Sequence, residues 1–189
     1  MQHTIRIANS NDVEGILSIY SYYILNTTYT FEYDVPTLPA FLARFNEISA
    51  KYPWIVYENE GEIMGYAYAS VAFERAAYQW DVDVSVYVNH HHTHRGIGKE
   101  LYQRLFLLLK QLGLYNLYAI ITETNAPSIS FHREFGFQDI GVFHKTGYKF
   151  EKWHDVLWME KHICRFDEKP QTPRIMIDLD SKIISEILS

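Results

Sequence analysis

The sequence has little cysteine, no excess of positive charge and no long apolar run, and each absence removes a class of protein. A single cysteine, Cys164, excludes an intramolecular disulfide and favours a reducing, cytoplasmic location. Lys and Arg number 17 against 23 Asp and Glu, so the net charge of −6 argues against a general nucleic-acid partner. No apolar stretch approaches the ~20 residues that span a bilayer, and residues 1–6 do not resemble a secretion signal, so we expect no membrane association.

Aromatic side chains, by contrast, are plentiful: 15 Tyr, 11 Phe and 4 Trp make up 16% of the chain. The 48% hydrophobic and 21% charged residues exclude disorder. A chain of 189 residues usually forms one domain that buries about 70% of its unfolded surface, a core that needs no disulfide or metal. The rings could line a pocket, form an interface or fill this core, and composition does not choose among these.

The first part of the chain predicts two helices and three strands. Asn11 and Glu14 have the spacing of a capping box, and apolar residues then recur at helical period. A turn that ends at Gly61 joins two strand patterns, which predicts a β-hairpin. The predicted elements are strand 5–8, a helix through 16–24, helix 38–50, and strands 54–58 and 63–71.

The second part contains the clearest strand, residues 81–88, in which four valines alternate with other residues. Asn125 offers a helix cap, and Gly136 stands where a helix C-terminus favours positive φ. The further elements are helix 98–112, strand 117–121, a helix after Asn125, and strands 137–142 and 156–159. Strands alternate with helices in the middle and pair at both ends, which indicates an α/β domain with a mixed sheet.

Residues 163–189 differ in character from the rest. Residues 169–173 contain two prolines and predict a short linker, and residues 181–188 carry apolar side chains at helical spacing. We therefore divide the chain into a domain over 1–162 and a C-terminal extension over 163–189, whose helix docks on its own domain or on a partner.

A glycine-containing turn over residues 93–99 follows the clearest strand and opens the next helix. Glycines allow close backbone approach to a ligand, and a helix start supplies free N–H groups and the positive end of the helix dipole. Arg95 and Lys99 add positive charge, so the turn predicts a phosphate or pyrophosphate cradle. Glu100 and Leu101 break the Walker and dinucleotide-binding patterns, respectively. A plain strand-to-helix turn is the alternative.

This turn resembles the acetyl-CoA loop of the GCN5-related N-acetyltransferases (GNAT), Gln/Arg-x-x-Gly-x-Gly/Ala. Residues 125–137 resemble the second signature of that family, an Asn-x-x-Ser/Ala helix that ends in Gly-Phe. The chain is most similar to the branch that acetylates phosphinothricin, methionine sulfoximine and methionine sulfone. The motifs for that branch are Arg75-x-x-Tyr78-x-Trp80, Ser85-Val86-Tyr87-Val88, Gly98-Lys99-Glu100-Leu101-Tyr102, Lys145-Thr146-Gly147-Tyr148-Lys149 and Trp153-His154-Asp155-Val156.

The resemblance covers roughly residues 4–161 and has two departures. Thr93 stands where the loop usually begins with Gln or Arg, which weakens one phosphate contact. Asp83 stands where the branch usually has Glu, and its side chain is one methylene shorter. We therefore expect Asp83 to reach a substrate amine through a water molecule.

The resemblance implies the GNAT fold, an α/β fold with a mixed, mostly antiparallel sheet, and acetyl-CoA as co-substrate. The pantetheine of the coenzyme would lie along the strand at residues 86–88, held by main-chain hydrogen bonds. The N–H of Val88 would polarise the thioester carbonyl, and the pyrophosphate would lie on the glycine turn. The implied coenzyme contacts are Val86, Tyr87, Val88, His94, Arg95, Gly96, Ile97, Gly98, Lys99, Asn125 and Ser128.

Two residues are candidates for proton transfer. Asp83 shares a strand face with Ser85 and Tyr87, and is a candidate general base; a solvated strand aspartate is its alternative, and Asp81 is a rival on the same face. His132 stands where most of the superfamily has a tyrosine acid near the coenzyme sulfur. It is a candidate donor to the thiolate, or an aid to amine deprotonation, or a packed histidine with no proton transfer.

The resemblance places acceptor recognition on the loop before the clearest strand. Arg75 would bind the carboxylate of an amino acid through its planar guanidinium, with Tyr78 nearby and Phe31 and Glu32 forming another wall. A solvated loop arginine is the alternative. A homodimer is also implied by the resemblance alone.

One further candidate is a zinc site, because four histidines lie close together in the sequence: His90, His91, His92 and His94. They lack a cysteine or a spaced acidic partner, and consecutive side chains on a turn diverge. We therefore predict an exposed polar loop and no metal.

The resulting hypothesis is an N-acetyltransferase that acetylates the amino group of a small amino acid or analogue by direct transfer in a ternary complex. Cys164 lies outside the motifs, so no acetyl-enzyme is required. Two alternatives stay open: another acceptor, such as a protein N-terminus, a polyamine or an aminoglycoside, and a non-catalytic acetyl-CoA sensor.

Overall fold

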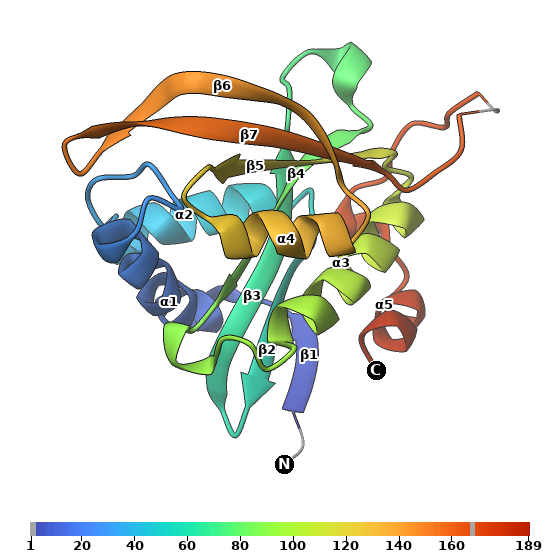
Figure 1. Cartoon of the computed structure of the whole chain (residues 1–189). Coiled ribbons are helices and arrows are strands. Elements are labelled where there is room, and N and C mark those ends of the chain that lie inside the picture. The colour runs from blue at the N-terminus through green and yellow to red at the C-terminus, as the bar shows by residue number, and fades with distance from the viewer. Residues whose placement is uncertain (1–2, 167–168) are drawn as a thin grey trace.

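The computed structural model describes residues 3–166 and 169–189 (Figure 1). Within these ranges the strands are β1 His3–Ile7, β2 Trp54–Asn59, β3 Glu62–Val71, β4 Asp81–Val88, β5 Asn116–Thr122, β6 Gln138–Lys149 and β7 Lys152–His162. The α-helices are α1 Val13–Asn26, α2 Leu38–Ser49, α3 Ile97–Leu112, α4 Ala126–Glu134 and α5 Ser181–Leu188. None of them is long and apolar enough to cross a bilayer.

The strands form one sheet in the order β1-β2-β3-β4-β5-β7-β6. Neighbouring strands are antiparallel except for β4 and β5, which are parallel. The predicted mixed α/β fold is thus confirmed. The last two strands are much longer than predicted. For β6 the reason is that most of its side chains are exposed at the sheet edge, so its sequence shows no alternation of apolar and polar residues.

The central feature of the sheet is the separation of β4 from β5. The two strands pair only at Asp81–Asn116, Val82–Leu117 and Asp83–Tyr118. Beyond Asp83, β4 continues beside β3 as far as Val88, while β5 continues beside β7. The sheet therefore opens into a V between two adjacent strands.

Two apolar clusters cover the two faces of the sheet. Successive side chains of a strand point to opposite faces, and successive residues of β2 belong to different clusters. Ile55 packs with the buried stripe of α3, which consists of Leu101, Leu105, Leu108, Leu109 and Leu112. Trp54 and Val56 pack on the other face with α1 and α2. This second cluster is rich in rings: Trp54 stacks on Tyr68 at 4.1 Å, and Tyr66 stacks on Tyr87 at 5.3 Å between ring centroids. Much of the aromatic content is therefore core.

The start of α1 differs from the predicted capping box. The box is formed by Asn9 and Asp12, with the Asn9 N–H donating to Asp12 at 2.8 Å, and not by Asn11 and Glu14. A 3-10 turn over Ser10–Asp12 precedes the helix and shifts the cap. Arg6 holds this turn from β1 through two hydrogen bonds of 2.7 Å to the Asp12 carboxylate.

The C-terminal extension packs on the domain. The predicted helix is present as α5, which lies against α3 (Figure 1). Met176 and Leu179 are buried in the core, and the N–H of Met176 donates to the carbonyl of Lys51 at 2.9 Å. Residues 169–173 have no regular secondary structure, yet Trp80 Nε1 donates to the carbonyl of Gln171 at 2.8 Å.

Candidate active site

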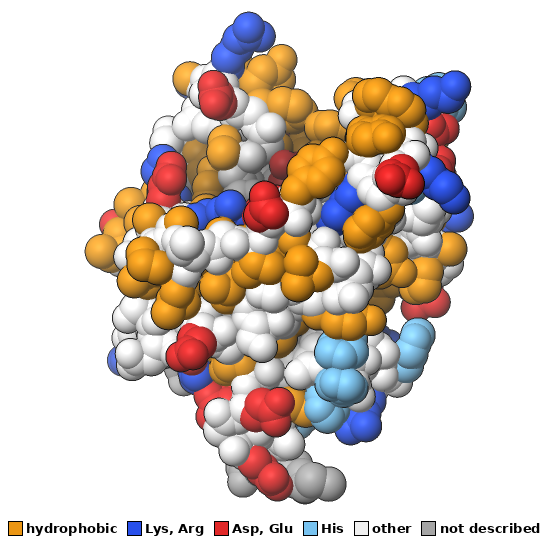
Figure 2. Space-filling model, turned by 90° about the vertical axis from the view of Figure 1, so that its left-hand side faces the viewer, with side chains coloured by type: hydrophobic (Ala, Val, Ile, Leu, Met, Phe, Trp, Pro, Cys, Tyr) orange, Lys and Arg blue, Asp and Glu red, His pale blue; other side chains and the backbone are white. Residues whose placement is uncertain are grey.

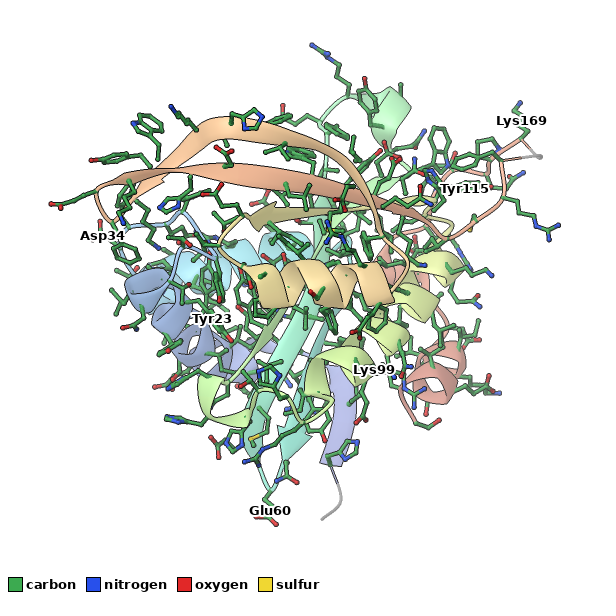
Figure 3. All side chains as sticks on the ribbon, in the orientation of Figure 1. Tyr23, Asp34, Glu60, Lys99, Tyr115 and Lys169 are labelled. Atoms are coloured by element: carbon green, nitrogen blue, oxygen red, sulfur yellow. The ribbon has the colours of Figure 1, made fainter. Side chains whose placement is uncertain are left out.

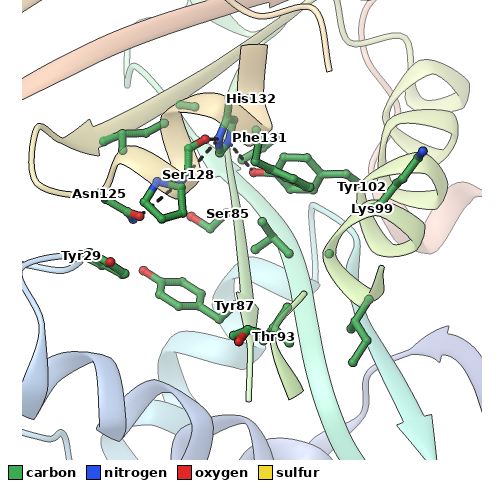
Figure 4. Close-up of a pocket in the computed structure, with 18 of the residues that line it drawn as sticks. Tyr29, Ser85, Tyr87, Thr93, Lys99, Tyr102, Asn125, Ser128, Phe131 and His132 are labelled. Carbon is green, nitrogen blue, oxygen red and sulfur yellow. Dashed lines mark hydrogen bonds between the residues drawn. The ribbon is translucent and has the colours of Figure 1, made fainter. Parts of the chain in front are cut away.

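A cavity of about 450 Å³ occupies the V between β4 and β5 and extends to the starts of α3 and α4 (Figure 4). This volume is within the range of small-molecule sites. Eleven of the residues predicted to contact a coenzyme or to transfer protons line it: Val86, Tyr87, Val88, His94, Gly96, Ile97, Gly98, Lys99, Asn125, Ser128 and His132. The predicted coenzyme contact Arg95 and the predicted base Asp83 do not line this cavity.

The edge of β4 is the main hydrogen-bonding surface in the cavity. Beyond Asp83, β4 keeps its antiparallel partner β3 but has lost β5. Backbone groups alternate between the two sides of a strand, so those on the β5 side from Val84 to Val88 are left without a ladder partner. Such an edge binds an extended chain as an added strand.

The glycine turn has the backbone conformation of an anion site. His94 and Gly96 have φ of 60° and 85°, and α3 begins directly after them at Ile97. Left-handed residues before a helix turn successive N–H groups toward one point, and the helix dipole favours negative charge there. A Cβ on Gly96 would meet no atom within 4 Å, so the glycine is needed for its positive φ and not for space.

Asn125 caps α4 and also lines the cavity. Its side-chain oxygen accepts from the N–H of Ser128 at 3.2 Å, and Pro127 lies in the first turn as predicted. Gly136 has the predicted positive φ, 81°, after the helix end.

His132 lies on α4, where it is 4% exposed and touches two polar groups. Its Nδ1 is 2.8 Å from the carbonyl oxygen of Ser128, and its Nε2 is 3.0 Å from the hydroxyl of Tyr102 (Figure 4). A carbonyl only accepts, so Nδ1 carries the proton and Nε2 accepts from Tyr102. Burial lowers the pKa of His132 to about 4, so the imidazole is neutral.

Asp83 is a partly buried carboxylate with one fully buried, unpartnered oxygen. Its Oδ1 is buried and makes no hydrogen bond to any residue that the structure describes. Burial raises the pKa of Asp83 to about 7. Its rival Asp81 is occupied, because Asn116 Nδ2 donates to it at 2.7 Å. Asp83 is therefore the carboxylate that is free to exchange a proton near neutral pH.

The three predicted acceptor residues lie outside the coenzyme cavity. Arg75 precedes a 3-10 turn over Ala76–Tyr78, and its guanidinium has no ion pair within residues 3–166 and 169–189. Tyr78 packs at 5.0 Å from Phe73, between ring centroids. Phe31 lies at 6.3 Å from the ring of His154 on β7. In the space-filling view the molecule is hollowed between two lobes at its top, with hydrophobic side chains around the hollow (Figure 2).

Several lining residues escaped the sequence reasoning. Tyr102 lies at helical spacing on α3, a pattern that by itself predicts core or interface packing, yet it is both buried there and part of the cavity lining. Tyr29, from the loop after α1, and Ile120, from the separated part of β5, are brought in by the tertiary fold alone. Phe131 also lines the cavity, and a Cβ at Gly98 would lie 3.6 Å from Cζ of its ring.

The histidine-rich turn has no metal-binding geometry. No group of three or more His, Cys, Asp or Glu among the described residues is arranged to hold a metal ion. The ring of His90 stacks instead on that of Tyr22, with 3.7 Å between centroids.

The fold and cavity define a class of protein: an α/β domain whose sheet opens between two adjacent strands into a cavity lined by a glycine turn and two helix starts. The chain belongs to the acetyltransferase (GNAT) domain family, whose pattern matches residues 5–158.

Relatives of the chain agree with that assignment. It is 33% identical over 170 residues to a phosphinothricin N-acetyltransferase of Streptomyces viridochromogenes, covering 90% of this chain and 91% of the relative. It is 32% identical over 165 residues to an L-methionine sulfoximine/L-methionine sulfone acetyltransferase of Pseudomonas paraeruginosa, covering 86% and 96%. A Sinorhizobium meliloti phosphinothricin acetyltransferase, solved in complex with AcCoA, superposes with a TM-score of 0.87 at 32% identity, covering 95% of this chain and 98% of that one.

Proposed function

We propose that this protein transfers the acetyl group of acetyl-CoA to the amino group of a small amino acid or analogue of the phosphinothricin or methionine sulfoximine type. The observation that carries the proposal is the unpaired edge of β4, which begins directly after Asp83, a partly buried carboxylate whose pKa is raised to about 7. The substrates named for the relatives support the acceptor class.

The residues around the cavity fit acetyl-CoA. In this proposal Val86, Tyr87 and Val88 bind the pantetheine through the β4 edge, and the Val88 N–H faces the thioester carbonyl. The N–H groups of the glycine turn bind the pyrophosphate, together with the charge of Lys99. The remaining proposed contacts are His94, Arg95, Gly96, Ile97, Gly98, Asn125 and Ser128. Arg95 lies outside the cavity, so its charge acts at the rim.

Asp83 is the proposed general base. It accepts a proton from the acceptor ammonium through water, which leaves a neutral amine to attack the thioester carbonyl. The C–N bond forms as the C–S bond breaks, the attacking nitrogen releases its second proton to water to give the amide, and the thiolate takes a proton. A carboxyl with a pKa near 7 is a stronger acid than a thiol, whose pKa is about 8.5, so Asp83 can return that proton through water.

The proposed role of His132 is narrower than the sequence predicted. With a pKa of about 4, only about one imidazole in 1,000 is protonated at pH 7, so donation from an imidazolium is disfavoured. We propose instead that neutral His132 orients Tyr102 in the cavity wall through the hydrogen bond to Nε2.

Arg75, Tyr78 and Phe31 are the proposed acceptor contacts. The unpaired guanidinium of Arg75 suits the carboxylate of an amino acid. Replacing Arg75 with Gln should lower kcat/KM for amino acids and leave it within about twofold for amines without a carboxylate. Equal losses for both kinds of acceptor would contradict carboxylate recognition.

A coupled assay of free CoA release, run over a panel of amino acids, polyamines, aminoglycosides and peptides, tests the function. We expect turnover that depends on an amino acid. Turnover without an acceptor, or coenzyme binding without turnover, would support a non-catalytic acetyl-CoA sensor. A preference for peptides or polyamines would contradict an amino acid as the acceptor. Direct transfer predicts no acetylated protein; a kinetically competent acetyl-enzyme would overturn it.

We also propose a cytoplasmic homodimer that binds neither nucleic acid nor membrane. Val142, Phe143 and Trp153 on β6 and β7 are exposed apolar side chains, which suit contact with a second copy. Light scattering after size exclusion tests this. Phe143→Asp should give monomers, whereas Ile177→Asp, at an exposed site outside that hairpin, should not. A monomeric wild-type protein would contradict the dimer.

A further inference from the structure

The loop over residues 27–37 joins α1 to α2 and lies beside the end of the β6–β7 hairpin, where Figure 3 labels Asp34. Tyr29 of this loop lines the coenzyme cavity. Glu32 of the same loop accepts a hydrogen bond from the hydroxyl of Tyr20 at 3.1 Å, and the ring of Tyr20 packs at 5.2 Å from that of Tyr87 on β4, between ring centroids. The loop therefore lies beside both the coenzyme cavity and β4, the strand that carries the proposed base, and this is where the proposed acceptor would fit.

Gly147 of β6 lies directly under the ring of Phe31. A Cβ added to Gly147 would be 2.1 Å from Cζ of Phe31 and 2.4 Å from Cε2. Its φ is outside the left-handed region, so the backbone does not require glycine there. The requirement is space: only a hydrogen at this position lets the end of the Phe31 ring approach the strand so closely.

Lys149, two residues further along β6, holds the backbone of the same loop. The side chain is 2% exposed, and Nζ donates to the carbonyls of Ile24 at 2.7 Å and Thr30 at 2.8 Å. Thr30 directly precedes Phe31. No carboxylate of the described residues lies within ion-pair distance of Lys149, so the buried ammonium is held mainly by these carbonyls.

From these contacts we infer that Gly147 and Lys149 are positioning residues that set the size of the acceptor site through Phe31. Gly147 fixes how far the ring lies from the acceptor, and Lys149 fixes the backbone that carries it. This inference rests on the proposed function, because it concerns the acceptor of that reaction.

The experiment compares Gly147→Ala with Gly141→Ala. Both glycines are on β6, but a Cβ at Gly141 would meet no atom within 4 Å, so it is a matched control. Steady-state kinetics are measured with acetyl-CoA and a series of amino acids of increasing side-chain length. We expect Gly147→Ala to change the ratio of kcat/KM between short and long acceptors by about tenfold, because displacing a packed ring is an overpacking effect. The acetyl-CoA KM should stay within about twofold, and Gly141→Ala should change neither.

Two further variants keep the inference testable if Gly147→Ala is unstable. Phe31→Ala in the Gly147→Ala background should restore the melting temperature, because it removes the clashing ring. Lys149→Met should raise the acceptor KM more than the acetyl-CoA KM. An unchanged acceptor ratio in Gly147→Ala, with an active wild type, would overturn the inference alone. A wild type that acetylates no amino acid would overturn the proposed function and the inference together.

Discussion

The hydroxyl of Tyr102 donates to Nε2 of His132 across 3.0 Å, and the opposite nitrogen of the same ring donates to the carbonyl of Ser128 across 2.8 Å. The two partners leave the buried imidazole no unused nitrogen, and because its pKa is lowered to about 4, the neutral ring accepts from Tyr102. This hydrogen-bond chain links α3 to α4 across the wall of the cavity.

The neutral state of His132 can be tested directly. We expect ¹⁵N NMR of the protein to show the Nδ1–H tautomer from pH 5 to 8, because burial lowers the pKa to about 4. Tyr102→Phe, which removes the donor to Nε2, should cost about 1–3 kcal/mol of unfolding free energy. A protonation midpoint near 6.5 would contradict the structure and would restore His132 as an acid.

Asp83→Asn should lower kcat by about 10²–10⁴-fold, the usual range for loss of a general base. The wild-type kcat/KM should rise with pH through an apparent pKa near 7, because Asp83 accepts a proton only when ionised. This rise of kcat/KM with pH should be absent from Asp83→Asn. Asp81→Asn is the matched control on the same strand face, since Asp81 already accepts from Asn116. A larger loss in Asp81→Asn would reverse the assignment.

Asp83 and His132 should act on stability in opposite directions. The folded-state pKa of Asp83 is raised from 3.8 to about 7. The stabilisation that the protonated carboxyl gives to the folded state is therefore fully present below pH 3.8 and is lost as the pH rises to 7. The amount is on the order of 4 kcal/mol. Thermal melts should therefore show Asp83→Asn gaining stability over the wild type as pH rises from 4 to 7. A constant difference between the two would contradict the burial of the charge.

For His132 the sign is reversed. Its folded pKa is lowered from 6.5 to about 4, so the unfolded chain binds the extra proton and stability falls as pH drops from 6.5 to 4. His132→Phe keeps an aromatic ring at the position and should remove this acid-side loss. The measurement is the melting temperature of both proteins over pH 4–7; parallel curves would contradict the prediction.

Gly96→Ala should weaken coenzyme binding through backbone strain. Gly61 is a matched control, since its φ is 84° and its Cβ position is also open, but it lies in the β2–β3 turn outside the cavity lining. Both variants should lose about 1–2 kcal/mol of stability. Only Gly96→Ala should raise the acetyl-CoA KM, and an equal KM rise in Gly61→Ala would show a general effect of destabilisation.

The C-terminal extension should contribute measurably to stability. Met176 is 8% exposed and its neighbour Ile177 is 81% exposed. Met176→Ala should therefore cost about 2–5 kcal/mol of unfolding free energy, and Ile177→Ala less than about 0.5 kcal/mol. Denaturant unfolding of both variants checks this. Equal small losses would mean that the extension does not stabilise the domain.

The elements that the sequence predicted well are those with one buried face. Residues 81–88 alternate strictly, and the predicted strand matches β4 residue for residue. Residues 98–112 carry a continuous apolar stripe, and the predicted helix differs from α3 by one residue. The length of β6 escaped prediction because its side chains are mostly exposed and impose no period.

The sequence by itself determined the α/β class, the glycine turn before α3 and, through its motifs, the resemblance to the GNAT family. These are local features, since spacing, φ preference and capping depend on neighbours in the chain. Only the tertiary structure decided that β4 leaves β5 after Asp83, that Oδ1 of Asp83 is buried without a partner, and that Phe31 lies on Gly147. Those facts depend on contacts between residues up to about a hundred positions apart, and solvent exclusion at such contacts is what shifts a pKa or shapes a pocket.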